Sequence, residues 1–550
     1  MIMDNKPMYD YNIYRVELKK VEALKSFLIE REFKNINLKN EQIKDSCGFN
    51  YELIFCDKRN NDGSPWINLL SSCSELDLKD ELKIYGAALI CRSKKNCFVI
   101  TYGNAHFYMN RFCDYNFGID IAQRILNPDE VKAQQNVSHG TKTSKMQIDY
   151  LDAATLKYKG GEIPTFIKGY STNPDIWGTY VKCGISVQFK WEERPLEIGK
   201  KLLEIEKILT RNYKYLIPKL IYLKEEEEPD KIDELFYKLA EAIDQYEDCP
   251  YKESYINIPS FYLVGTNNIE NDCVGFKITC KGKRKEYIDD FSISYIKNFM
   301  DEKSLDLKEN IKKINLSIQY GNSQWTPLKP LTSYLEFITD DNYCLRNGKW
   351  CKFNKAYINQ IFRDVRRVKF ISHKNDDLWS VSKNYLINFA KENNLPVNEK
   401  RPQIETFYIK RFAEKHENIN IIHPNTIKID DKLTNKGQYK YEICDFYQND
   451  DMYFVKRGDP GKFVSAIEQA FITLSKIKNG KGKLKLPSGK ILKPKSIHLL
   501  LILEDRVTEI ERWEDIGSIN FLLQLIDLHQ SIADMDLSLF VDFTYEKKIR

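Results

Sequence analysis

The last third of the chain alternates short apolar strands with helices, and that order limits the folds it can adopt. The helical spacing of apolar residues predicts helices over 354–370 and 384–394. β-forming residues then predict a three-stranded meander, a helix, a strand, a second helix and a final strand. These segments are 419–429, 439–447, 451–458, 462–477, 496–504, 518–532 and 537–545. This part of the chain should therefore form a sheet covered by helices.

The remainder of the chain predicts further mixed α/β structure. Residues 1–130 show a strand, a helix and β-hairpins, and a short helix that ends at Asn127-Pro128. Glycine, proline and polar residues interrupt 131–175, which predicts an ordered but irregular connection. A chain of 550 residues is long enough for several domains. The expected division is an α/β domain at 1–150, a helical or mixed domain at 151–330 and a C-terminal domain at 331–550.

Composition and spacing argue against several classes of protein. The 13 cysteines form no Cys-x-x-Cys pair and the 7 histidines are dispersed, so disulfides and a zinc or His-built metal centre lose support. No apolar run of about 18 residues occurs, so we expect no membrane segment, and a cytoplasmic location follows. The formal charge of +5 balances 84 basic against 79 acidic residues, so the position of charge matters more than its sum.

The order predicted for the last third is the core layout of restriction-endonuclease-like proteins, and we expect that fold at 331–550. Nucleases of this fold carry an Asp on the second strand and an acidic-x-Lys sequence on the third. Two carboxylates share Mg²⁺ there, and the lysine assists the attacking water. Asp445 in "EICDFY" and Lys456 in "YFVKRG" stand at the matching positions.

The second carboxylate is missing from the third strand, where Phe454 stands two residues before Lys456. Glu468 on the following helix is the available replacement. In the enzyme hypothesis Asp445 and Glu468 hold Mg²⁺, Lys456 assists the water and Gln469 helps to orient it. Two alternatives remain open: a nuclease-like domain that binds nucleic acid without cutting it, and an exposed cross-strand ion pair of Asp445 and Lys456 without a function.

Basic residues in the same domain favour a nucleic-acid partner. The segment 476–495 contains no acidic residue, and its glycines and prolines keep it out of a helix. Its lysines are Lys476, Lys478, Lys481, Lys483, Lys485, Lys490, Lys493 and Lys495. If five of them contacted phosphates, log K would fall by about 4.5 for each tenfold rise in salt. Arg457 follows the candidate lysine, and a second cluster comprises Arg363, Arg366, Arg367 and Lys369. The alternative for the lysine segment is a solvated hairpin.

Five landmarks in a fixed order resemble the sporadically distributed protein family of bacteria. They are "VITYGNAHF", "FCDYNFGIDIAQRILNPDEV", "LLEIEKILTRNYKYLIPKLIYL", "YCLRNGKWCKF" and "EICDFYQNDDMYFVKRGD", within about residues 99–475. This family has no assigned activity and occurs near restriction and phage-defence genes, so the resemblance implies a role in genome defence. The family typically has a histidine at the position of Phe454, which also lacks a carboxylate.

Taken together, these observations predict a cytoplasmic antiphage defence protein that binds DNA through a nuclease-like C-terminal domain. The first alternative is an active Mg²⁺-dependent DNA endonuclease. The second is a protein-binding subunit of a defence complex, which would work with another defence protein. An oligomer is compatible with each of the three hypotheses.

Overall fold

A computed structural model describes most of the chain. The described residues are 7–38, 47–60, 82–138, 144–244, 256–257, 273–288, 293–320, 325–339, 341–346, 348–373, 383–394, 404–422, 426–430, 438–458, 463–478, 493–503, 510–533 and 535–545. They form two compact units. The first comprises 1–137, 144–158 and 162–219, and the second comprises the rest. The boundary predicted after residue 150 falls within a strand of the first unit, Ser144–Ala154.

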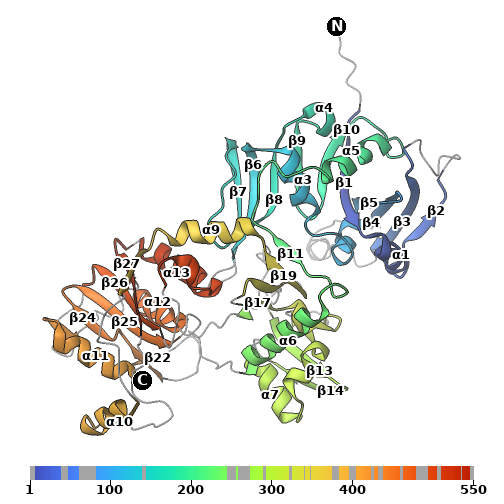
Figure 1. The fold of residues 1–550 in the computed structure, drawn as a ribbon. Coiled ribbons are helices and arrows are strands. Elements are labelled where there is room, and N and C mark those ends of the chain that lie inside the picture. The colour runs from blue at the N-terminus through green and yellow to red at the C-terminus, as the bar shows by residue number, and fades with distance from the viewer. Residues whose placement is uncertain are drawn as a thin grey trace, which may run out of the picture. The chain divides into compact units, whose positions relative to one another are not determined.

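The first unit is built on one large sheet with the strand order β2-β3-β4-β5-β1-β10-β9-β8-β6-β7 (Figure 1). Its strands are β1 Tyr9–Val16, β2 Lys34–Ile36, β3 Asn50–Asn60, β4 Leu82–Arg92, β5 Cys97–Gly103, β6 Leu126–Ser138, β7 Ser144–Ala154, β8 Glu162–Ser171, β9 Tyr180–Cys183 and β10 Val187–Trp191. Its helices are α1 Val21–Ile29, α3 Phe117–Ile125, α4 Pro174–Trp177 and α5 Gly199–Leu209. Separate apolar clusters form under α1 and under α3 and α5.

The irregular connection predicted for 131–175 is wrong, because strands β6, β7 and β8 occupy most of it. β7 lies at the end of the sheet and exposes most of its side chains. An edge strand of this kind is held by backbone hydrogen bonds to its neighbour and needs no apolar stripe, so its sequence looks like a loop. The helix predicted before Asn127-Pro128 is confirmed as α3, and β6 begins at Leu126.

The second unit begins with two small antiparallel sheets. Their orders are β11-β19-β18-β17-β12 and β14-β13-β15-β16. The strands are β11 Leu220–Tyr222, β12 Ile256–Asn257, β13 Cys273–Cys280, β14 Lys283–Tyr287, β15 Asn315–Tyr320, β16 Lys329–Pro330, β17 Glu336–Ile338, β18 Tyr343–Arg346 and β19 Lys349–Phe353. Helices α6 Pro229–Asp244, α7 Ser294–Glu302 and α8 Leu307–Asn310 accompany them. β18 and β19 form a hairpin with Gly348 at its turn, and Gly348 has φ +75°.

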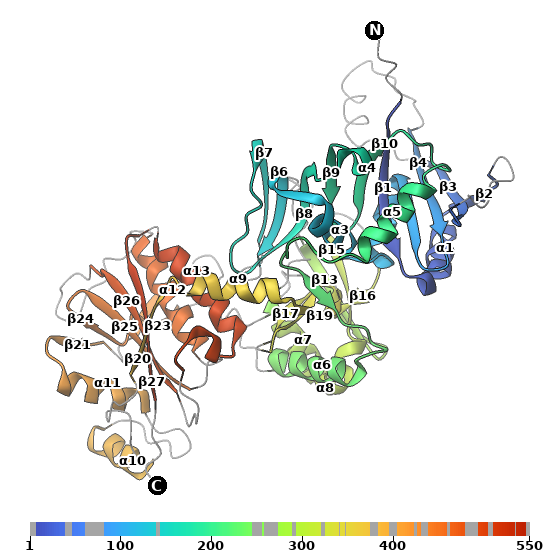
Figure 2. The same cartoon turned by 45° about the horizontal axis from the view of Figure 1, so that its top comes forward.

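A larger mixed sheet follows, with the order β20-β27-β26-β25-β24-β21 (Figure 2). Its strands are β20 Lys369–His373, β21 Ile419–Ile421, β24 Phe446–Gln448, β25 Asp451–Gly458, β26 Ser496–Leu503 and β27 Ser538–Tyr545. The helices are α9 Lys355–Val365, α10 Lys383–Glu392, α11 Ile404–Lys415, α12 Val464–Lys478 and α13 Ile519–Ala533, and a separate hairpin joins β22 Thr426–Asp430 to β23 Gln438–Glu442. β24 runs antiparallel to β21 and β25, whereas β25, β26, β27 and β20 are parallel.

Opposite faces of this sheet carry different helices. α11 packs on one face, where Phe412 contacts Phe446 and Tyr453. α12 and α13 cover the other, where Phe463 contacts Phe521 and Phe543. Both faces of the sheet are apolar because successive side chains of a strand point to opposite sides, as Tyr453 and Phe454 do in β25. The meander and helices expected from the sequence are therefore present, but the predicted strand 439–447 is interrupted between β23 and β24.

Nine of the ten cysteines whose side chains the structure describes are buried, which is typical of small apolar residues in the interior. Among the described residues, no helix combines the length and apolar character needed to cross a membrane.

Candidate functional site at the edge of β25

Strand β25 is longer than its neighbour β24, and the difference leaves part of its edge without a strand partner. The pairing of β24 with β25 runs from Gln448 opposite Asp451 to Phe446 opposite Tyr453. β25 continues to Gly458, paired on its other side with β26. The backbone N–H groups of Val455 and Arg457 point toward the β24 side, and buried N–H groups of this kind require acceptors.

Asp445 supplies the first acceptor. Its backbone N–H donates to the carbonyl of Tyr453 at 2.9 Å, and its carboxylate Oδ2 accepts from the N–H of Val455 at 2.7 Å. Asp445 is only 3% exposed. Its side chain therefore takes the place of the next strand residue, which is why β24 begins only at Phe446. The hypothesis of an exposed cross-strand ion pair does not describe this buried carboxylate.

Glu405, in the first turn of α11, supplies the second acceptor. Its Oε1 accepts from the backbone N–H of Arg457 at 3.3 Å and lies 3.1 Å from Nζ of Lys456. The side chains of Lys456 and Glu405 are 32% and 31% exposed, so their ion pair contributes about 1 kcal/mol or less. Two carboxylates and a lysine thus lie together at this edge: Asp445, Glu405 and Lys456.

The carboxylate oxygens that accept hydrogen bonds from β25 are too far apart to share a Mg²⁺ ion. The N–H groups of Val455 and Arg457 hold Asp445 and Glu405, respectively. They are two residues apart on one strand, so the two N–H groups lie about 7 Å from each other. Two oxygens bound to the same Mg²⁺ lie at most about 4 Å apart, since each Mg–O distance is about 2.1 Å. Within the described residues, no three His, Cys, Asp or Glu side chains are grouped so that they would hold a metal ion.

Glu468 and Gln469, predicted to replace the missing ligand and to orient water, are half-buried on α12. The hydroxyl of Thr473, on the same helix, donates to the carbonyl of Ile443 at 2.5 Å. α12 therefore runs beside the residues that lead into Asp445. This contact concerns Thr473, and the metal pair of Asp445 and Glu468 stays a prediction.

The basic residues predicted to bind nucleic acid are only partly within the described chain. Lys481, Lys483, Lys485 and Lys490 lie outside it, and so do the side chains of Lys476 and Lys478. Lys495 is 80% exposed, with Nζ 3.2 Å from Asp450. Lys493 directly precedes the segment that enters β26.

The second basic cluster is engaged with its own surroundings. Arg366 pairs with Glu514, and Arg363 donates to Gln360. Arg367 lies 3.7 Å from Asp364 but remains 69% exposed. Lys369 lies over the ring of Phe540 at 4.4 Å. Each of these side chains therefore already has a partner within the chain.

Sequence reasoning missed Glu405 because it did not recognise α11. The segment "IETFYIKRFAEK" carries Ile404, Phe407 and Tyr408 at the i, i+3, i+4 spacing of a helix face, and Phe407 and Tyr408 are buried. An acidic residue in the first turn is also typical of a helix N-terminus. Those signals identify the helix, but only the tertiary fold brings its first turn to β25.

Comparison with known proteins places the chain in a family without assigning an activity. The chain belongs to a family of unknown function, DUF6119, whose profile matches residues 11–462. No curated protein and no solved structure matches it.

Proposed function

We propose that the C-terminal part of the chain has a restriction-endonuclease-like fold and binds DNA without cutting it, in the service of antiphage defence. The topology supports the fold: the meander β21-β24-β25 is followed by parallel strands β26 and β27, with helices before β21 and between β25, β26 and β27. This is the order expected from the sequence, with the hairpin β22–β23 as an insertion. The resemblance to a family found near defence genes supports the biological role.

The edge of β25 carries the proposal. Asp445, Glu405 and Lys456 gather where β24 ends, which is the place at which nucleases of this fold carry out their chemistry. Both carboxylates accept hydrogen bonds from the backbone of β25, and the oxygens that accept them are too far apart to bind one Mg²⁺ ion. The site therefore favours a nuclease-like surface retained for binding.

Positive charge at the start of β25 supports DNA as the partner. Lys493 and Lys495 lead into β26, whose first residue, Ser496, pairs with Asp451 at the start of β25. They end the lysine segment 476–495, which contains no acidic residue to oppose binding to phosphates. Lys456 and Arg457 would then meet the DNA backbone at the strand edge.

An active endonuclease is the second candidate. It is favoured by Glu405, because this residue brings a second carboxylate to the strand edge, and the sequence motif has none at the position of Phe454. In that case Glu405 must leave Lys456 and Arg457 to approach Asp445. Mg²⁺ would be the metal, and the described arrangement of the two carboxylates would have to change before both could bind it.

Incubation of the full chain with plasmid and single-stranded DNA, with and without Mg²⁺ or Mn²⁺, separates the candidates. We expect no cleavage, together with binding whose log K falls by about 4.5 per tenfold rise in salt if five lysines contact phosphates. A variant with Lys481, Lys483 and Lys485 replaced by alanine should bind more weakly and lose about 2.7 from that slope. Lys224→Ala, a surface lysine paired with Glu227, is the matched control and should bind normally.

Two results would change this conclusion. Metal-dependent cleavage that Asp445→Asn and Glu405→Gln both abolish would establish the nuclease. These variants keep an acceptor for the N–H groups of β25, so a loss of activity would not reflect unfolding. An absence of DNA binding at low salt would instead favour a protein-binding subunit that works with a second defence protein.

A further inference from the structure

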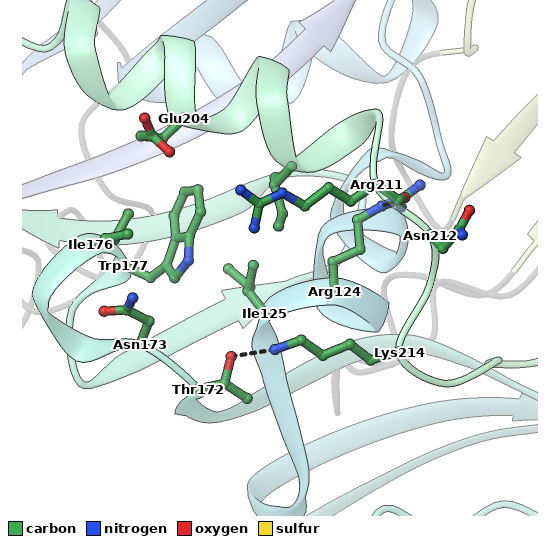
Figure 3. A pocket seen from close by; sticks show the side chains of 11 residues that line it. Arg124, Ile125, Thr172, Asn173, Ile176, Trp177, Glu204, Arg211, Asn212 and Lys214 are labelled. Atoms are coloured by element: carbon green, nitrogen blue, oxygen red, sulfur yellow. Dashed lines mark hydrogen bonds between the residues drawn. The ribbon is translucent and has the colours of Figure 1, made fainter.

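A pocket in the first unit has the character of an anion site and is independent of the proposed DNA-binding function (Figure 3). Its volume is about 260 Å³, near the lower end for small-molecule sites. Apolar side chains form the floor, including Ile125, Ile208 and Trp177, which are 1%, 8% and 4% exposed. Polar and basic side chains surround it: Arg124, Thr172, Asn173, Arg211, Asn212 and Lys214.

Arg124 is the buried cation of this pocket. It is 7% exposed, and its guanidinium donates to the carbonyls of Arg211, Asp120 and Leu209 at 2.9, 2.6 and 3.1 Å. Neutral carbonyls satisfy the N–H groups of the guanidinium but carry no full negative charge. The partial negative charge at the C-terminal end of α5 therefore compensates the charge of Arg124 only in part. The nearby carboxylate of Asp120 is instead paired with Lys219. Arg124 also fixes the chain at 209–211, from which Arg211 extends.

Two exposed cations complete the positive wall. Arg211 reaches from the end of α5 toward Trp177, and Lys214 lies on another side of the pocket beside Thr172 (Figure 3). Nζ of Lys214 donates to the Thr172 hydroxyl at 2.9 Å. In the described part of the chain, no acidic side chain forms an ion pair with Arg211 or Lys214.

The single acidic residue of the pocket is already neutralised. Glu204 lines the wall, and its Oε1 lies 2.6 Å from Nζ of Lys207, which is outside the pocket. Arg124, Arg211 and Lys214 therefore leave an excess of positive charge over an apolar floor. Positive side chains with hydroxyl and amide donors beside them match the oxygens of a phosphate group.

We propose that this pocket binds a small phosphate-bearing ligand, either free phosphate or a phosphate monoester. The phosphate lies between Arg211 and Lys214, with Thr172 and Asn173 as further hydrogen-bonding partners. Arg124 contributes its charge from beneath. The organic part of a monoester rests on Ile125, Ile208 and the edge of Trp177.

Calorimetry with the full chain tests this proposal, with inorganic phosphate, ribose 5-phosphate and ribose as probes. We expect saturable binding of at least one phosphate probe and none of ribose. Arg211→Ala and Lys214→Ala should each weaken binding at least tenfold, and both residues are exposed, so their loss should not unfold the chain. Lys182→Ala on β9, also exposed, is the control and should bind as the wild type does.

Charge variants next to the pocket sharpen the test. Lys207→Ala should weaken phosphate binding because it exposes the charge of Glu204, and Glu204→Gln should maintain or strengthen it. Equal affinity for both phosphate probes would identify free phosphate as the ligand, and tighter binding of ribose 5-phosphate would identify a monoester. The proposal is overturned if neither phosphate probe saturates, if ribose binds as well, or if Arg211→Ala and Lys214→Ala match the control.

Discussion

At the scale of single residues, Asp445 shows how one side chain can define the end of a strand. Its carboxylate accepts the N–H of Val455 while its own N–H donates to Tyr453. The sequence predicted Asp445 as a Mg²⁺ ligand in the enzyme hypothesis, and the structure shows its carboxylate buried and hydrogen-bonded to the backbone of β25. Its function in binding and its contribution to the fold therefore have to be separated by experiment.

Replacement of Asp445 tests the structural contribution. Asp445→Ala leaves the buried N–H of Val455 without its acceptor, which should lower the free energy of unfolding of the C-terminal sheet by about 1–3 kcal/mol. Asp445→Asn keeps a carbonyl oxygen and should cost less. Hydrogen exchange of β25 and β26 peptides in increasing urea measures the effect. Equal protection in the wild type and both variants would show that this hydrogen bond does not stabilise the sheet.

At the scale of elements, ionic contacts attach helices to strands that are distant in sequence. Asp341 lies between β17 and β18. Its Oδ2 atom is 3.1 Å from the Nζ atoms of Lys231 and Lys238, which are both on α6. Burial raises the pKa of Asp341, but the Thr339 hydroxyl and the two ammonium groups outweigh it and lower the pKa to about 2. The charged carboxylate therefore holds α6 to this segment.

The sign of this pKa shift predicts a pH dependence. The pKa of Asp341 is lower in the folded state than its ordinary value of 3.8, so its contribution is present above about pH 4 and is lost as the pH falls toward 2. Relative to Asp341→Asn, the wild type should show greater hydrogen-exchange protection of α6 at pH 6. That difference should shrink between about pH 4 and pH 2.

Glu241→Gln serves as the control for this measurement. Glu241 is also on α6 but faces Lys308 of α8, with 3.2 Å between Oε1 and Nζ. Its replacement should leave the exchange of β17 and β18 unchanged. If the difference between wild type and Asp341→Asn persists at pH 2, the carboxylate charge is not its source.

At the scale of the whole molecule, the chain divides near residue 219 into two units with their own cores. The apolar clusters of the first unit draw on residues from Tyr9 to Ile217. This differs from the sequence-based plan of three domains with boundaries after 150 and 330. The polar, glycine and proline residues of 131–175 suggested a connection between domains there, but the large sheet joins strands from both sides of residue 150.

A fragment comprising residues 1–219 should therefore fold without the rest of the chain, because its core is complete. We expect a single cooperative urea transition, and binding of the phosphate probe equal to that of the full chain. A fragment ending at 150 lacks β8, β9 and β10 and should not unfold cooperatively. Non-cooperative unfolding of the longer fragment would mean that the first unit depends on the second.

The sequence by itself determined much of the local structure, because the signals involved act over a few residues. Apolar periodicity located α9, α10, α12 and α13, and β-forming runs located β25, β26 and β27. The turn at Gly348 was also predictable, because its positive φ favours glycine. These features depend on the backbone propensity of a few neighbouring residues and on which face of a helix or strand is apolar.

Only the tertiary structure decided which residues meet. The polar edge strand β7 has a strand conformation because β6 pairs with it, and Glu405 reaches β25 because α11 packs on the sheet. Arg124, Thr172 and Arg211 come together in the phosphate pocket from three separate segments. Such contacts depend on the packing of distant elements, and a sequence read one window at a time carries no signal for them.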